Sequence, residues 1–296
     1  MVSGLLPQPV PFQIFQTESS SILSPVAGFL GDAGFTHSLT PARNCTFGCT
    51  YCYVPTMRVR AGLRSGDWQH WGQWTTIKRN AAQLLRRELR SHQVIYCSPL
   101  TDPYQPAETE ACLMPHLLEA VAANPPRVFV IQTRGPLIVR DIDLLRVLAA
   151  RTTLRVSFSI TTDADSVRRI FEPGCASICE RWQTVAALQS AGIQTSVAIA
   201  PILPCDPAAI IGRAAALTGG PIVADPFHVR AVKRSGATTR DAAIAICGRH
   251  GWDEWLDPLF QRSILDRMAA LANENGRKFG HGPAGFGLLA SAGNTH

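Results

Sequence analysis

The sequence is poor in charged and aromatic side chains and has no long apolar run. Of its 296 residues, 17% are charged and 7% are aromatic. No stretch approaches the roughly 18–20 consecutive apolar residues that a membrane-spanning helix requires, and residues 1–16 place no positive charge ahead of an apolar segment, as a secretory signal does. Because 46% of the residues are hydrophobic, the chain can bury a large core, which excludes disorder. These features predict a cytoplasmic protein with no membrane segment.

The cysteines do not read as a disulfide framework. There are nine of them, an odd number, and no secretory signal precedes them. In such a chain cysteines are expected to be free thiols, metal ligands or catalytic groups.

The positive charge is confined to one segment. The formal net charge is +6, and residues 55–92 contain eight basic and two acidic side chains, so the rest of the chain is neutral. The basic residues run from Arg58 to Arg90, with Trp68, Trp71 and Trp74 among them. Such a segment can stack bases and contact phosphates. It can equally be a solvated face whose tryptophans hold a loop to the body. The sequence leaves both interpretations open.

Short apolar or β-branched runs alternate with helical patterns along the chain. The runs, which predict buried strands, lie at 94–97, 128–132, 154–160, 195–199 and 221–224. The helical patterns lie at 75–91, 112–123, 141–150, 177–191 and 206–217. This alternation predicts an α/β fold with parallel strands, either an open sheet or a whole or partial barrel. Functional residues are then expected at the carboxyl ends of the strands.

We predict four segments in the chain. They are an N-terminal lead-in at 1–33, the α/β body at 34–235, a C-terminal helical extension at 236–275 and a flexible Gly-containing tail at 276–296. The extension carries helical patterns at 238–247 and 255–275.

Three cysteines lie within eight residues, at the spacing C-x3-C-x2-C: Cys45, Cys49 and Cys52. Pro41, Pro55 and Gly48 oppose a helix here, so a loop is predicted. Three thiolates with no nearby fourth suit an iron–sulfur cluster that has one iron open. Structural zinc usually has a complete set of four Cys or His ligands, and packed thiols are a third interpretation.

The motif, with Tyr51 before the last cysteine, resembles the signature of the radical S-adenosylmethionine (radical SAM) superfamily. More narrowly, the chain resembles the spore photoproduct lyase-like group, also labelled DNA repair photolyases. The run T-D-P-Y-Q-P-A-E at 101–108 and the sequence E-P at 172–173 also resemble that group. Two departures are T-P-A-R-N before Cys45, where the group usually reads N-P-Y-R-G, and Arg134 where a lysine is common.

The resemblance implies a partial (β/α)6 TIM-type barrel with a C-terminal helical cap and its first strand near 34–39. It implies a [4Fe-4S] cluster on Cys45, Cys49 and Cys52, S-adenosyl-L-methionine (SAM) on the open iron, and a flavodoxin- or ferredoxin-type reductant. Reductive cleavage of SAM would give a 5′-deoxyadenosyl radical that abstracts hydrogen from the substrate. The SAM contacts implied are Tyr51 and Tyr53 for adenosine; Ser98, Thr101 and Asp102 for the amino group; Arg134 for the carboxylate; and Ser157 and Ser159 for the ribose.

Two further sets of cysteines have a functional and a structural interpretation. Cys97 ends a predicted strand, close to where spore photoproduct lyase presents the cysteine that returns hydrogen to the product radical. The resemblance therefore implies a hydrogen donor, and the structural interpretation is a small buried apolar residue. Cys175 and Cys179, with Cys205 or Cys247, hold an auxiliary cluster or metal, or are only packed.

Three functions remain open. The first is a radical SAM lyase acting in DNA repair, and the second is the same chemistry on RNA, a peptide or a small molecule. The third is a zinc-stabilised protein that binds nucleic acid through the region from Arg58 to Arg90.

Overall fold

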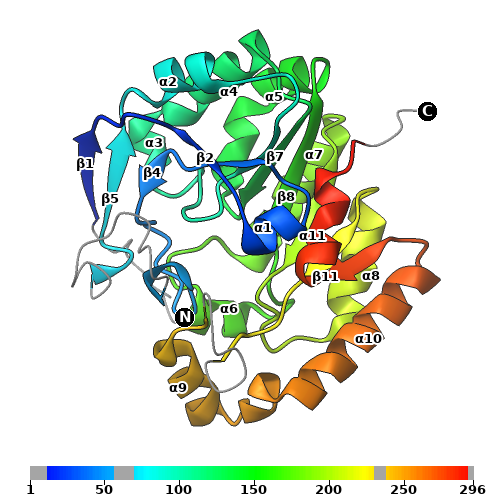
Figure 1. Cartoon of the computed structure of the whole chain (residues 1–296). Helices are drawn as coiled ribbons and strands as arrows, with labels where there is room; N and C mark the ends of the chain where they lie inside the picture. The colour runs from blue at the N-terminus through cyan, green and yellow to red at the C-terminus, as the bar shows by residue number, and fades with distance from the viewer. Residues whose placement is uncertain (1–11, 57–69, 230–237, 293–296) are drawn as a thin grey trace, which may run out of the picture.

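The computed structural model describes residues 12–56, 70–229 and 238–292 (Figure 1). Within these ranges no helix has both the length and the apolar character needed to cross a membrane.

The body is a curved sheet whose strands are almost all parallel. Its order is β11-β10-β9-β8-β7-β6-β3-β2, and only the β2–β3 pair is antiparallel. The strands are β2 (Leu23–Pro25), β3 (His37–Leu39), β6 (Val94–Cys97), β7 (Val128–Thr133), β8 (Thr153–Ser159), β9 (Thr195–Ile199), β10 (Ile222–Ala224) and β11 (Phe279–His281). Among the described residues β11 does not pair with β2, so the barrel is partial, as expected.

Helices cover one face of this sheet (Figure 1). They are α2 (Ala81–Glu88), α4 (Leu113–Ala123), α5 (Ile142–Ala149), α6 (Asp165–Phe171), α7 (Ile178–Ser190) and α8 (Pro207–Leu217). Alternate strand residues such as Ile95, Phe129 and Val156 are fully buried in the core beneath these helices. The chain continues through three helices, α9 (Asp241–His250), η5 (Asp253–Leu256) and α10 (Pro258–Glu274), which lie within residues 236–275.

The inner face of the sheet is packed against the C-terminal helix, α11 (Gly282–Ala290). Phe286 and Leu289 of α11 join Val94 and Val130 in one buried cluster. The Arg155 guanidinium donates a hydrogen bond to the Leu289 carbonyl (2.5 Å). The prediction of a flexible tail at 276–296 was therefore wrong for the residues described, because β11 extends the sheet and α11 fills its inner face.

A small second sheet lies beside the first, in the order β1-β5-β4. It contains β1 (Gln13–Thr17), β4 (Ala42–Arg43) and β5 (Trp74–Lys78). The predicted helix at 75–91 was wrong in its first part, since the chain forms β5 before α2 begins. The predicted lead-in likewise contains β1, β2 and α1 (Gly28–Asp32).

The basic segment is described only in part, because Arg58, Arg60, Arg64 and Trp68 lie outside the described residues. Trp71 is buried, and Arg79 pairs with Glu18 (2.6 Å). Arg86 and Arg87 lie in the last turn of α2, which leads into the start of β6 and thus toward the end of the sheet opposite the strands' carboxyl ends. The buried Trp71 agrees with the packing interpretation of this residue.

Candidate active site

The cysteine motif lies in a loop, as predicted, between β4 and η1 (Val54–Thr56). Backbone hydrogen bonds from Gly48 N to Cys45 O (3.3 Å) and from Cys52 N to Cys49 O (3.2 Å) form two tight turns. Gly48 has a φ of +63°, and a Cβ there would be 3.2 Å from the Gly72 Cα. The left-handed conformation and this close approach both favour glycine.

Two other loops hold the cysteine loop in place. Gln105 Oε1 accepts hydrogen bonds from Thr46 N (2.8 Å) and Thr46 Oγ1 (3.1 Å). On the other side, Gly174 packs so closely that a Cβ would lie 2.7 Å from the Phe47 carbonyl oxygen. The cysteine loop is thus held between the loop after β6 and the loop after α6.

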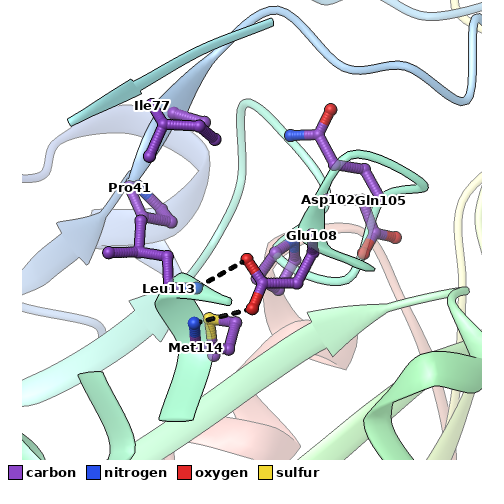
Figure 2. A pocket seen from close by; sticks show the side chains of 9 residues that line it. Pro41, Ile77, Asp102, Gln105, Glu108, Leu113 and Met114 are labelled. Atoms are coloured by element: carbon purple, nitrogen blue, oxygen red, sulfur yellow. Dashed lines mark hydrogen bonds between the residues drawn. The ribbon is translucent and has the colours of Figure 1, made fainter. Parts of the chain in front are cut away.

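Residues of the run 101–108 hold the cysteine loop and the neighbouring helix in place (Figure 2). Besides the Gln105 contact, Glu108 accepts hydrogen bonds from Leu113 N (3.1 Å) and Met114 N (2.8 Å), which caps the first turn of α4. Glu108 also pairs with Arg140 (3.0 Å). These residues support the site from α3 (Glu108–Ala111) and the adjoining turn.

The three thiols are in different electrostatic surroundings. Burial raises the pKa of Cys45 well above its ordinary value and raises that of Cys52 to about 12. The hydrogen bond with Cys175 lowers the pKa of Cys49, assisted by the positive charge of Arg134 and opposed by burial. Metal binding would deprotonate all three thiols.

The donor set fits an iron–sulfur cluster. It offers three soft thiolate ligands from one well-held loop, and the buried Asn44 Nδ2 beside them has no hydrogen-bond partner among the described residues. In the part of the chain that the structure describes, no three His, Cys, Asp or Glu side chains are grouped closely enough to hold one metal ion together.

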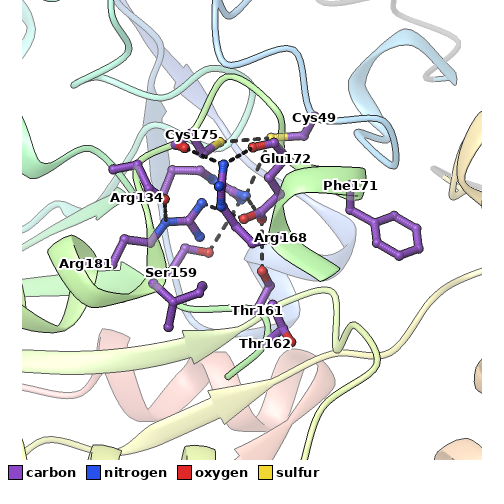
Figure 3. Close-up of polar contacts among 12 residues, drawn as sticks. Cys49, Arg134, Ser159, Thr161, Thr162, Arg168, Phe171, Glu172, Cys175 and Arg181 are labelled. Atoms are coloured by element: carbon purple, nitrogen blue, oxygen red, sulfur yellow. Dashed lines mark hydrogen bonds and ion pairs between the residues drawn. The ribbon is translucent and has the colours of Figure 1, made fainter. Parts of the chain in front are cut away.

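Glu172 is the centre of a buried polar network next to Cys49 (Figure 3). Its carboxylate accepts hydrogen bonds from Arg181 Nη2 (2.5 Å), Thr161 Oγ1 (2.9 Å), Arg134 Nη1 and the Tyr51 hydroxyl. Burial alone would raise the pKa of Glu172, but Arg181 and Arg134 outweigh it and lower the pKa to about 2. The carboxylate is therefore ionised at neutral pH. Glu172 begins the E-P sequence at 172–173, and no site role was predicted for it.

Arg134 connects this network to the cysteine loop. Its Nη1 lies 3.6 Å from Cys49 Sγ, and its Nη2 lies 3.5 Å from Ser159 Oγ. Asp102 holds its backbone, accepting hydrogen bonds from Arg134 N (2.8 Å) and Thr133 Oγ1 (2.6 Å). Four predicted residues, Arg134, Asp102, Tyr51 and Ser159, are therefore brought together with Cys49.

The remaining predicted hydroxyl groups lie at the carboxyl ends of the strands or in the cysteine loop. Ser98 Oγ and Thr101 Oγ1 form a hydrogen bond with each other (3.1 Å). The Tyr53 hydroxyl donates to the Pro99 carbonyl (2.6 Å), and its side chain is 40% exposed. Ser157 Oγ is fully buried and has no partner among the described residues. Because an unsatisfied buried hydroxyl is costly, Ser157 is suited to a polar ligand.

The other cysteines are more dispersed. Cys97 is fully buried in the core beneath the helices, whereas its neighbour Tyr96 faces the inner side of the sheet. Cys179 is exposed, whereas Cys175 is buried with its sulfur 3.9 Å from Cys49 Sγ. The sequence offers Cys175 for an auxiliary site with Cys179, but in the structure its described sulfur contact is with Cys49 of the cysteine motif.

A second polar pair was not anticipated from the sequence. Asp225 directly follows β10, and its carboxylate lies 2.6 Å from His228 Nε2. The spacing D-x-x-H at the end of a predicted strand was the available signal.

Comparison with known proteins gives consistent matches. The family model described as the Radical SAM superfamily matches residues 39–207. An uncharacterized protein of Mycobacterium tuberculosis is 28% identical over 174 residues, which cover 57% of this chain and 50% of that protein. An uncharacterized protein of Acidianus two-tailed virus is 27% identical over 175 residues, covering 56% of each chain. The chain thus spans about half the length of these relatives.

Solved structures match over a larger part of the chain. A spore photoproduct lyase complexed with dinucleoside spore photoproduct has a TM-score of 0.60 at 13% identity, covering 90% of this chain and 81% of that one. A further form with bound AdoMet and the same dinucleoside also has a TM-score of 0.60, at 14% identity and with the same coverage. This likeness confirms the predicted fold.

Proposed function

Because the chain belongs to the radical SAM superfamily, we propose that it is an enzyme that binds a [4Fe-4S] cluster through Cys45, Cys49 and Cys52 and cleaves SAM reductively. When bound, the cluster supplies the electron that splits a carbon–sulfur bond of SAM and yields the 5′-deoxyadenosyl radical. The observation that carries the proposal is that the three cysteines come from one supported loop and that one of them, Cys49, lies next to the Arg134–Glu172 network.

The charges of that network favour an anionic ligand. Two guanidinium groups, those of Arg134 and Arg181, share the single carboxylate of Glu172, so one positive charge is left over. Arg181 is fully buried, whereas the Arg134 side chain is 15% exposed. Arg134 is therefore the group that would bind the SAM carboxylate, and Asp102 and Glu172 would hold it in position.

The aromatic and hydroxyl groups would bind the rest of SAM. Tyr51 is fixed through its hydroxyl by Arg134 and Glu172, and the more exposed ring of Tyr53 is available to an adenine. Ser157 and Ser159 alternate with Val156 and Phe158 on β8, which places both hydroxyls on the inner face of the sheet. A ligand there would be shielded from water on the side filled by α11.

The proposal is tested by anaerobic reconstitution. Protein treated with ferrous iron and sulfide should contain about four of each per chain and should form 5′-deoxyadenosine with SAM and dithionite. Zinc without sulfide would instead support the structural-zinc alternative.

Replacing Ser157 with alanine tests the predicted SAM contact. Since Ser157 Oγ has no described protein partner, the variant should retain wild-type stability towards urea. Loss of one hydrogen bond to SAM, about 1 kcal/mol, should raise the dissociation constant of SAM about fivefold, measured by calorimetry on reconstituted protein. Ser263→Ala, on the exposed side of α10, is the control. An unchanged SAM affinity would remove Ser157 from the site.

For the substrate, we propose DNA containing a photochemical lesion, with the same chemistry on RNA, a peptide or a small molecule as the alternative. The support is the fold shared with spore photoproduct lyase, whose solved complexes contain dinucleoside spore photoproduct. Assays with SAM and dithionite, with and without ultraviolet-irradiated DNA, distinguish the two. Binding through the basic segment should weaken steeply between low and physiological salt.

We propose separately that Cys97 donates hydrogen to the product radical. Replacing Cys97 with alanine should leave 5′-deoxyadenosine formation intact but change the distribution of products. Its thiol is fully buried, so this role requires that substrate binding expose it. Identical products and turnover in the variant would show that Cys97 is only a core residue.

A further inference from the structure

Cys175 and Cys49 come from segments far apart in the sequence but meet in the structure. They are 126 residues apart in the chain, yet their sulfur atoms lie 3.9 Å from each other. Figure 3 shows the two side chains pointing toward one another across the space beside Glu172. Both residues are buried, at 7% exposure each. Rotation about the side-chain bonds is the motion that would be needed to bring the two sulfurs into bonding distance.

The backbone around Cys175 is firmly held in this position. Cys175 N donates to the Glu172 carbonyl (3.0 Å), and Arg168 Nη1 donates to the Cys175 carbonyl (2.9 Å). The preceding Gly174 packs directly on Phe47 of the cysteine loop. The pairing of the two thiols is therefore a consequence of how the loop after α6 packs on the cysteine loop.

We propose that Cys175 is a reversible oxidation site, which forms a disulfide with Cys49 when the chain carries no cluster. The role of Cys49 as a cluster ligand rests on the proposed function, but the disulfide does not depend on it. With this bond formed, one of the three ligand sulfurs is masked and protected from further oxidation. Reduction returns the thiol set that binds iron.

The reaction balances with hydrogen peroxide as the oxidant. One thiol takes an oxygen atom from the peroxide to become a sulfenic acid, and a molecule of water is released. The second thiol attacks the sulfenic sulfur, the S–S bond forms, and the hydroxyl group leaves as a second water molecule. The two thiols lose two electrons, and the peroxide gains them.

The test uses the full chain, prepared free of iron under reducing, anaerobic conditions. The protein is treated with equimolar hydrogen peroxide, its remaining thiols are alkylated, and tryptic peptides are mapped without reduction. Cys49 falls in the peptide 44–58 and Cys175 in the peptide 170–181. The wild-type chain should yield these two peptides as a cross-linked pair that dithiothreitol separates.

Matched variants identify the sulfurs involved. The peptide 170–181 also contains Cys179, so Cys179→Ser should retain the cross-link, whereas Cys175→Ser and Cys49→Ser should lower its yield at least tenfold. In excess peroxide, Cys175→Ser should also accumulate the irreversible sulfinic acid at Cys49, located by fragmenting peptide 44–58, whereas the disulfide protects Cys49 in the wild type. These measurements depend only on the masses of the peptides and do not require a bound cluster.

The proposal is overturned if the wild type gives no cross-link to peptide 170–181, or if the cross-link persists in Cys175→Ser. It is equally overturned if only Cys45, Cys49 and Cys52 pair among themselves. The proposed function fails separately, when the reduced chain takes up no iron and sulfide. A chain with the cross-link but no cluster would therefore retain this inference and lose the other.

Discussion

Replacing Cys45, Cys49 or Cys52 with alanine is expected to reduce 5′-deoxyadenosine formation from SAM and dithionite to background. Each cysteine would bind a different iron, and the other described cysteines lie on other segments, including Cys175, whose sulfur is 3.9 Å from Cys49 Sγ. A missing thiolate leaves an iron without its protein ligand, and the incomplete cluster is lost or unable to transfer its electron. Chromatographic quantification of 5′-deoxyadenosine after anaerobic reconstitution measures the effect, together with iron and sulfide content.

Cys179→Ala is the matched control for these variants, because Cys179 is exposed on α7. It should keep the iron content and the 5′-deoxyadenosine yield of the wild type. Full activity in a variant that lacks all three motif cysteines would exclude their role as ligands.

Replacing Glu172 with alanine is expected to lower the free energy of unfolding by about 3–5 kcal/mol. The substitution leaves the fully buried Arg181 without its carboxylate and removes the partner of Arg134. Two neighbouring positive charges would then repel one another in a site with little water. Urea unfolding monitored by circular dichroism measures the loss.

Two matched variants separate the charge of Glu172 from its packing. Glu172→Gln keeps the shape and should cost less than the alanine variant while still losing the ion pairs. Glu119→Gln changes an exposed carboxylate that lies 3.7 Å from His116, and should alter stability by no more than about 0.5 kcal/mol. If Glu172→Ala were as stable as this control, the network would not hold the site together.

The low pKa of Glu172 also predicts a pH dependence. The folded chain holds the pKa at about 2, below the ordinary 4.5, so ionisation of Glu172 favours the folded state. This contribution is complete above about pH 4.5 and is lost as the pH falls toward 2. The difference in stability between wild type and Glu172→Gln should therefore shrink over this range. A constant difference would show that the carboxylate is not the stabilising group.

The parts of the structure that could be predicted from sequence are those with local signals. The runs of β-branched residues gave β6 to β10 to within a few residues, because buried parallel strands need continuous apolar sequence. The cysteine motif likewise predicted its own loop, since Pro41, Gly48 and Pro55 oppose a helix.

The failures have physical reasons of two kinds. Glycines at 280 and 285 suggested flexibility, but a Cβ on Gly285 would lie 2.2 Å from the Gly280 carbonyl carbon, so these glycines permit close packing. The helical pattern at 75–91 joined two elements, because β5 is specified by its pairing with β1, some 60 residues earlier in the chain. In the same way, nothing near Cys175 in the sequence indicates that Cys49 will be its neighbour.

The position of α11 determines from which side the interior can be reached. Since this helix packs on the inner face of the sheet near Val94 and Val130, that part of the inner face is closed to solvent. Ligands would therefore enter from the carboxyl ends of the strands, where Arg134 and Ser159 lie. A chain truncated before Phe279 would lack β11 and α11, so water should reach the inner face of the sheet from the side that α11 now covers.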